Sequence, residues 1–178
     1  MFRTQLRALA RAAAHGPLKV MLPMVTLPEE LLQTRVLLQA EAGALARAGI
    51  AAAMPALGAM VEVPAAALTI DHFAADFLSI GSNDLIQYLM AAGRDNATLA
   101  YLQNPLHPAL LELITRVAHH GSSKGLEVSV CGEMAAQPQC LAALLNAGIR
   151  ALSVPPAALG RIKAALAATK IHRHGQID

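Results

Sequence analysis

The feature that most constrains this chain is a regular alternation of short apolar segments with helical ones. The apolar segments are nearly continuous in hydrophobic residues, and they cover residues 18–25, 56–63, 77–80, 126–130 and 149–154. Strands without polar alternation are typical of a parallel sheet whose faces are covered by helices. The chain is therefore expected to adopt an α/β fold, in which ligands bind at the carboxyl ends of the strands.

Helices are expected between these strands. The clearest starts at Pro28, where Thr26, Leu27, Pro28 and Glu29 fit a capping box with an early proline. The expected helices cover residues from 2 to about 14, from 28 to about 48, from 64 onward, 84–92, 108–124, 138–146 and 156–170. This predicts one domain over residues 1–170, followed by a polar tail at 171–178.

The number of strands limits the possible architectures. A closed (β/α)8 barrel takes about 250 residues, whereas this chain has 178 residues and about five expected strands. The sheet is therefore either open or part of a barrel.

Composition excludes several classes of protein. The net charge is only +2 and the basic residues are scattered, so no nucleic-acid surface is expected. No apolar run reaches the length of a membrane span, so no membrane partner is expected. Cys131 and Cys140 lack metal-ligand spacing, which favours a cytoplasmic protein with free thiols.

Two carboxylates follow neighbouring expected strands, Glu62 after the second and Asp84 after the third. Taken alone, Glu62 is explained equally well as a salt-bridged residue at the edge of the sheet, and Asp84 as the N-cap of a helix. Together they suit Mg²⁺, a hard cation that takes one or two protein carboxylates and completes its coordination with ligand oxygens and water. Asn83 and the backbone N–H groups after Gly81 are candidates for holding an oxyanion.

Two further side chains are candidates for chemistry. Arg94 lies on the long irregular segment that follows the Asp84 helix, from which it could bind a phosphate or carboxylate, or remain a solvated loop residue. Cys131 ends the fourth strand, where a thiol could exchange a proton with a reacting carbon or be an inert core residue. Cys140 is expected in the core. The histidines are not expected to be catalytic; those considered are His107, His119, His120, His172 and His174.

Five ordered motifs resemble a known family. They are Phe-Arg-Thr-Gln-Leu-Arg-Ala at 2–8, Met-Leu-Pro-Met at 21–24, and the segments at 58–66, 79–88 and 131–135. In this order, over nearly the whole chain, they resemble the phosphoenolpyruvate (PEP)-binding domain of Enzyme I. Enzyme I is the phosphoenolpyruvate–protein phosphotransferase of the bacterial sugar phosphotransferase system.

The resemblance implies a (β/α)8 barrel of which this chain holds about the last five β/α units. It implies that PEP binds with Mg²⁺, that Glu62 and Asp84 hold the metal, and that Asn83 and Arg94 bind phosphate. It also implies that Cys131 protonates enolpyruvate to pyruvate. In the family, the phosphoryl group passes to a histidine of a separate domain and then to the carrier protein HPr.

The chain departs from the family in ways that shape the expectation. The phosphohistidine domain and the first barrel strands, which carry further arginines, are absent from the sequence, and residues 93–96 read Gly-Arg-Asp-Asn where the family often has Asp-Arg-Gly-Asn. The isolated chain is therefore expected to be inactive, and to be a homo-oligomer such as a dimer or to be complemented by an N-terminal Enzyme I-like polypeptide. The alternatives are a Mg²⁺-dependent pyruvate or PEP lyase or aldolase of similar fold, and a non-catalytic PEP-binding fragment.

Overall fold

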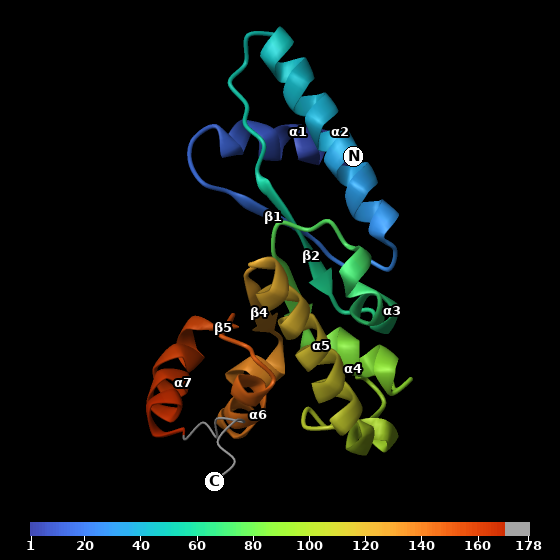
Figure 1. Ribbon diagram of the computed structural model, residues 1–178, viewed down its shortest axis with the longest axis vertical. Helices are drawn as coiled ribbons and strands as arrows, with labels where there is room; N and C mark the ends of the chain where they lie inside the picture. Colours follow the sequence, from blue (N-terminus) through green and yellow to red (C-terminus); the bar gives the residue numbers. More distant parts are fainter. Residues whose placement is uncertain (170–178) are drawn as a thin grey trace.

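Residues 1–169 are described by a computed structural model, and they form a five-stranded parallel sheet connected by helices (Figure 1). The strands are β1 (Lys19–Leu22), β2 (Ala56–Val61), β3 (Leu78–Gly81), β4 (Val128–Cys131) and β5 (Ala151–Leu152). They are hydrogen-bonded in the order β1-β2-β3-β4-β5, and every neighbouring pair is parallel. The predicted α/β fold with a parallel sheet is confirmed.

The helices occupy the connections, as expected. They are α1 (Phe2–Ala13), α2 (Pro28–Arg47), α3 (Pro64–Leu68), α4 (Ser82–Leu89), α5 (Pro108–Lys124), α6 (Leu141–Asn146) and α7 (Pro156–Ala168). Four short 3-10 helices lie between them: η1 (Ile70–His72), η2 (Ala97–Leu102), η3 (Glu133–Ala136) and η4 (Pro138–Cys140). Four of the seven α-helices begin with a proline. Proline has no N–H, and this costs no hydrogen bond there because the first N–H groups of a helix have no acceptor within the helix.

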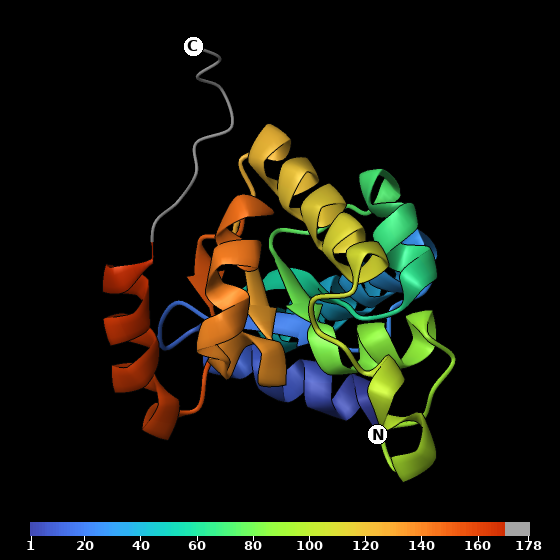
Figure 2. The ribbon, with the colours of Figure 1, turned by 90° about the horizontal axis from the view of Figure 1, so that it is seen from below.

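The strand order identifies the architecture as part of a barrel. Each strand pairs with the next one in sequence, so the connections never reverse direction across the sheet. Parallel crossovers are right-handed, so connections that all run in one direction place all the helices on the same face of the sheet. The sheet then curves with its other face inward, as in a barrel. Figure 2 shows the later helices following one another around the strands. The described chain is thus an incomplete (β/α)8 barrel.

The two faces of the sheet differ in chemistry. The face beneath the helices carries large apolar residues that are fully buried, among them Leu57 on β2 and Leu78 and Ile80 on β3. The inner face carries Met60 together with small and polar side chains, and the Ser129 hydroxyl of β4 donates a hydrogen bond to Ser79 on the neighbouring β3 (3.1 Å).

Several predicted boundaries were too long or shifted. Strand β1 ends at Leu22 rather than residue 25, because the backbone of Met24 takes a left-handed conformation that no strand continues. Helix α4 begins at Ser82, two residues earlier than predicted. The predicted 138–146 helix is divided into η4 and α6. At the start of α2, Glu30 rather than Glu29 folds back to accept the N–H of Leu27 (2.8 Å).

The carboxyl terminus was predicted as a helix to residue 170 and a polar tail at 171–178. Helix α7 ends at Ala168, and the predicted tail lies outside the described residues. Within residues 1–169, every helix is too short or too polar to cross a membrane.

Candidate functional site

Glu62 lies directly after β2 and is almost completely buried, with 4% of its surface exposed. Its Oε1 accepts the backbone N–H of Met24 at 2.7 Å, from the loop after β1. On its other side the backbone of Gly81 is so close that an added Cβ would lie 2.6 Å from Oε2. The carboxylate is therefore held between the ends of β1, β2 and β3.

Burial and a second carboxylate raise the pKa of Glu62. Burial is the larger cause, and the neighbouring Asp84 carboxylate adds to it, while the Met24 N–H and the positive charge of Arg94 act in the opposite direction. Two carboxylates placed this close repel each other when both are ionised, and a cation between them would remove that repulsion. The arrangement has the electrostatics of a cation site.

Asp84 and Arg94 form an ion pair at the start and after the end of α4. Arg94 Nη2 donates to Asp84 Oδ1 at 2.9 Å, and Arg94 Nε donates to Gln87 Oε1 at 3.3 Å. Gln87 lies one turn after Asp84 on the same face of α4. The structure thus brings the predicted arginine back to the strand ends, with about half of its side chain exposed.

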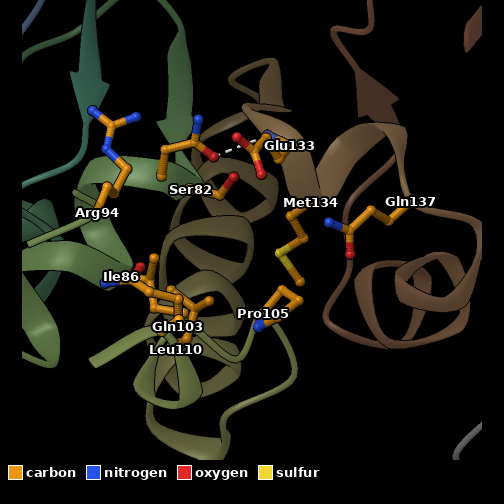
Figure 3. Close-up of a pocket in the computed structure, with 11 residues that line it drawn as sticks. Ser82, Ile86, Arg94, Gln103, Pro105, Leu110, Glu133, Met134 and Gln137 are labelled. Carbon is orange, nitrogen blue, oxygen red and sulfur yellow. Dashed lines mark hydrogen bonds between the residues drawn. The ribbon is translucent and has the colours of Figure 1, made fainter. Parts of the chain in front are cut away.

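Asn83 is oriented by the neighbouring strand. Its Oδ1 accepts the backbone N–H of Glu133 at 2.9 Å, a bond drawn as a dashed line in Figure 3. Gly132 makes this approach possible, since a Cβ there would lie 2.7 Å from Asn83 Oδ1 and 2.5 Å from Ser82 Oγ. This bond orients the side chain by its acceptor, Oδ1, and the amide N–H₂ of Asn83 is the group that can donate to an anion.

Cys131 ends β4 in register with Gly81 of β3. Its thiol donates to the Ile80 carbonyl oxygen (Sγ to O, 3.5 Å), and the side chain is partly exposed rather than buried in the core. The Ser82 hydroxyl in turn donates to the Cys131 carbonyl oxygen at 2.7 Å. Cys131 therefore lies at the same edge of the sheet as Glu62, one strand beyond Gly81.

A pocket of about 250 Å³ adjoins these residues between α4, α5, η2 and η3. In Figure 3 the polar groups of Ser82 and Glu133 lie at one end, and Ile86, Leu110 and Pro105 line the other. Arg94 and Asn83 belong to its wall. The long loop predicted to be irregular thus contributes both the arginine and one wall of a cavity.

The oxygen ligands at the strand ends suit Mg²⁺. Residues 1–169 contain no group of three or more His, Cys, Asp or Glu side chains placed to hold a metal. Mg²⁺ does not need one, because it commonly binds through one or two carboxylates and the oxygens of a phosphorylated substrate. Glu62 and Asp84, adjacent and mutually repelling, fit that requirement.

Three positioning groups were not identified from the sequence. They are the Met24 N–H on Glu62, Gln87 on Arg94 and the Glu133 N–H on Asn83. Gln87 could have been found from its spacing of three residues from Asp84 on one helix, whereas the other two depend on contacts between distant segments. One expectation agrees with the structure: Cys140 is fully buried, which raises the pKa of its thiol. His107 caps α5 by accepting the Ala109 N–H (3.2 Å). His172 and His174 lie outside the described residues.

Comparison with known proteins adds sequence relatives. Residues 1–171 match the family described as PEP-utilising enzyme, PEP-binding domain. The chain is 48% identical over 157 residues to a phosphoenolpyruvate-protein phosphotransferase of Geobacillus stearothermophilus, covering 86% of this chain and 27% of the relative. It is 45% identical over 167 residues to that of Cupriavidus necator, covering 92% and 28%. The chain thus spans little more than a quarter of the length of these curated relatives.

Solved structures are similar in fold. A citrate lyase from Burkholderia xenovorans superimposes with a TM-score of 0.67 at 22% identity, covering 92% of this chain and 53% of that one. An HpcH/HpaI aldolase/citrate lyase family protein from Burkholderia cenocepacia gives 0.59 at 18% identity, covering 91% and 68%. At these identities the likeness concerns the fold alone.

Proposed function

Because the chain belongs to the family of PEP-binding domains of PEP-utilising enzymes, we propose that it forms the PEP site of a phosphoenolpyruvate–protein phosphotransferase. The observation that carries the proposal is the meeting of Glu62, Asp84 and Arg94 at adjacent strand ends. The match over residues 1–171 and the 45–48% identity to phosphotransferases support the choice of substrate.

The side chains have complementary roles toward a small, highly charged anion. Arg94 binds a phosphate oxygen through its planar guanidinium, and Asn83 donates through its side-chain amide. Glu62 and Asp84 would hold Mg²⁺, which when bound neutralises phosphate charge during transfer. In the structure Arg94 is paired with Asp84 (2.9 Å). If Asp84 bound Mg²⁺ instead of Arg94, the guanidinium of Arg94 would be available to bind the phosphate.

Cys131 is the proposed acid. As the bond between phosphorus and the enol oxygen breaks, the phosphoryl group passes to a histidine nitrogen of a separate domain. The enol C–O group becomes the ketone carbonyl, and carbon 3 takes a proton from the Cys131 thiol. Pyruvate then leaves, and the thiolate is reprotonated from solvent. Cys131 Sγ lies 3.5 Å from the Ile80 carbonyl oxygen, at the strand end where such a carbon would be presented.

The proposal extends to partners. The phosphohistidine would come from an Enzyme I-like polypeptide or region, HPr would be the next acceptor, and the setting would be cytoplasmic sugar uptake. Since the chain spans little more than a quarter of its relatives, we propose that residues 1–178 alone bind PEP without completing the transfer.

A lyase or aldolase remains the competing reaction for the same two carboxylates. The solved aldolase and citrate lyase structures are 18–22% identical and support it only through the fold. Such an enzyme would exchange the methyl protons of pyruvate in a metal-dependent way without any phosphoryl acceptor. Proton NMR of pyruvate in deuterated buffer distinguishes it from the phosphotransferase.

Calorimetric titration with PEP, with and without Mg²⁺, tests the proposal. We expect binding that requires Mg²⁺ and that weakens at least about tenfold in Asp84→Ala, since a cation ligand and the partner of Arg94 are both removed. Glu112→Ala, which removes an exposed carboxylate on α5, serves as the matched control and should bind like wild type. Equal affinity in wild type and Asp84→Ala, or binding that is indifferent to Mg²⁺, would refute the proposed site.

A further inference from the structure

Met24 has an unusual backbone. Among residues 1–169 only two non-glycine residues have a positive φ, Met24 at 54° and Ala91 at 51°. This left-handed conformation is one that L side chains rarely adopt, and such residues cluster at functional sites. Met24 follows Pro23 in a bend directly after β1, at the end of the Met-Leu-Pro-Met motif.

The strained conformation has a visible result. It directs the Met24 N–H toward Glu62 Oε1, at a distance of 2.7 Å across 38 residues of sequence. The Met24 side chain extends toward α4, where Sδ lies 4.0 Å from the Tyr88 hydroxyl. One residue therefore links the end of β1, the carboxylate after β2 and the helix that carries Asp84.

Glu62 is confined on its opposite side as well. Its Oε2 lies against the bare backbone of Gly81, where an added Cβ would be 2.6 Å away. Held by a donor on Oε1 and by backbone near Oε2, the carboxylate has little freedom to rotate. Its orientation beside Asp84 is thus set by groups that would not themselves touch a cation.

We propose that Met24 is a positioning residue, whose left-handed backbone aims an N–H at Glu62 and fixes the carboxylate in the orientation that shares a divalent cation with Asp84. The inference rests on the proposed cation site and adds a residue to it. Hydrogen bonds to the ligands of a metal commonly govern its affinity, and their loss weakens binding about 10- to 100-fold.

The test uses Mn²⁺ as the probe and electron paramagnetic resonance to count bound ion on the full chain. Met24→Gly keeps the N–H and tolerates positive φ, so we expect wild-type affinity. Met24→Val disfavours positive φ, and an ester in place of the residue 24 amide removes the N–H. We expect each to weaken Mn²⁺ binding about tenfold. Met54→Val, at an exposed methionine at the other end of the sheet, is the matched control.

A second measurement is independent of metal and of whether the valine variant folds. In a chain labelled with ¹⁵N-methionine, the Met24 amide proton should resonate downfield and move upfield in Glu62→Ala. An unmoved resonance would overturn the inference, as would an ester variant that binds Mn²⁺ like wild type. If wild type itself binds no Mn²⁺, the proposed site fails and the role of Met24 with it; if all variants bind equally well, the role of Met24 alone fails.

Discussion

At the scale of single residues, the absence of a side chain matters as much as the presence of a charged one. Gly81 leaves room for the Glu62 carboxylate, and Gly132, with φ of 92°, leaves room for the Asn83 amide. Both glycines lie at strand ends. Gly81 is in register with Cys131, and Gly132 directly follows Cys131. A methyl group at either position would displace a proposed ligand-binding side chain.

Gly81→Ala is the sharpest test of this packing. The new Cβ would lie 2.6 Å from Glu62 Oε2 and 2.9 Å from Glu62 Cβ, so Glu62 must turn away from Asp84. We expect Mg²⁺-dependent PEP binding to be lost in calorimetry, and the free energy of unfolding to fall by about 1 to 3 kcal/mol because of overpacking.

Gly160→Ala is the control for that change. Gly160 lies on α7 with open space where its Cβ would be, so alanine should leave PEP binding unchanged. It should also raise the free energy of unfolding by roughly 0.5 to 1 kcal/mol, through helix propensity. Retained PEP affinity in Gly81→Ala would show that the position of Glu62 is unimportant.

At the scale of elements, α1 is joined to α2 by ion pairs between a buried carboxylate and two arginines that are about half exposed. Glu41 on α2 is 1% exposed and accepts Arg3 Nε on Oε1 and Arg7 Nε on Oε2, both at 2.7 Å. Hydrogen bonds from these two guanidinium groups lower the pKa of Glu41. The arginines belong to the first motif of the family resemblance, which therefore has a structural role in holding α1 against α2.

The pH dependence of this cluster follows from the direction of the shift. A carboxyl whose pKa is lower folded than unfolded stabilises the fold above its unfolded pKa, and the stabilisation is lost as pH falls through its folded value. We expect Glu41→Gln to be less stable than wild type in urea denaturation at pH 7, with the difference shrinking below about pH 4.5. Glu112→Gln, at an exposed position on α5, should show no such difference. A constant difference at all pH values would mean that the cluster contributes through packing alone.

At the scale of the whole molecule, the sheet has two edges. In the described part of the chain β1 and β5 each have a neighbour on one side only. Unpaired strand edges are templates for pairing with another chain.

We therefore expect the 178-residue chain to form oligomers in light-scattering measurements, or to bind the amino-terminal remainder of a relative such as that of Cupriavidus necator. That complex should bind PEP more tightly than the chain alone. With Asp84→Ala the complex should still form but lose PEP binding. A stable monomer that melts cooperatively and ignores the added remainder would contradict this expectation.

The sequence by itself determined the fold class and the five site candidates, Glu62, Asp84, Asn83, Arg94 and Cys131. For four of them the reason is local: apolar runs mark buried parallel strands, and residues at or just after the end of such a run lie at the carboxyl edge of the sheet. Arg94 was a candidate because it lies on the long segment that follows the Asp84 helix.

Only the tertiary structure decided which groups meet. The Met24 N–H reaches Glu62 and the Glu133 N–H reaches Asn83 across 38 and 50 residues, and Arg94 returns to Asp84 after a turn at the strained backbone of Ala91. Such contacts depend on strand register and loop path, which are set by the packing of the whole sheet. For that reason no local pattern could reveal that a methionine backbone orients a buried carboxylate.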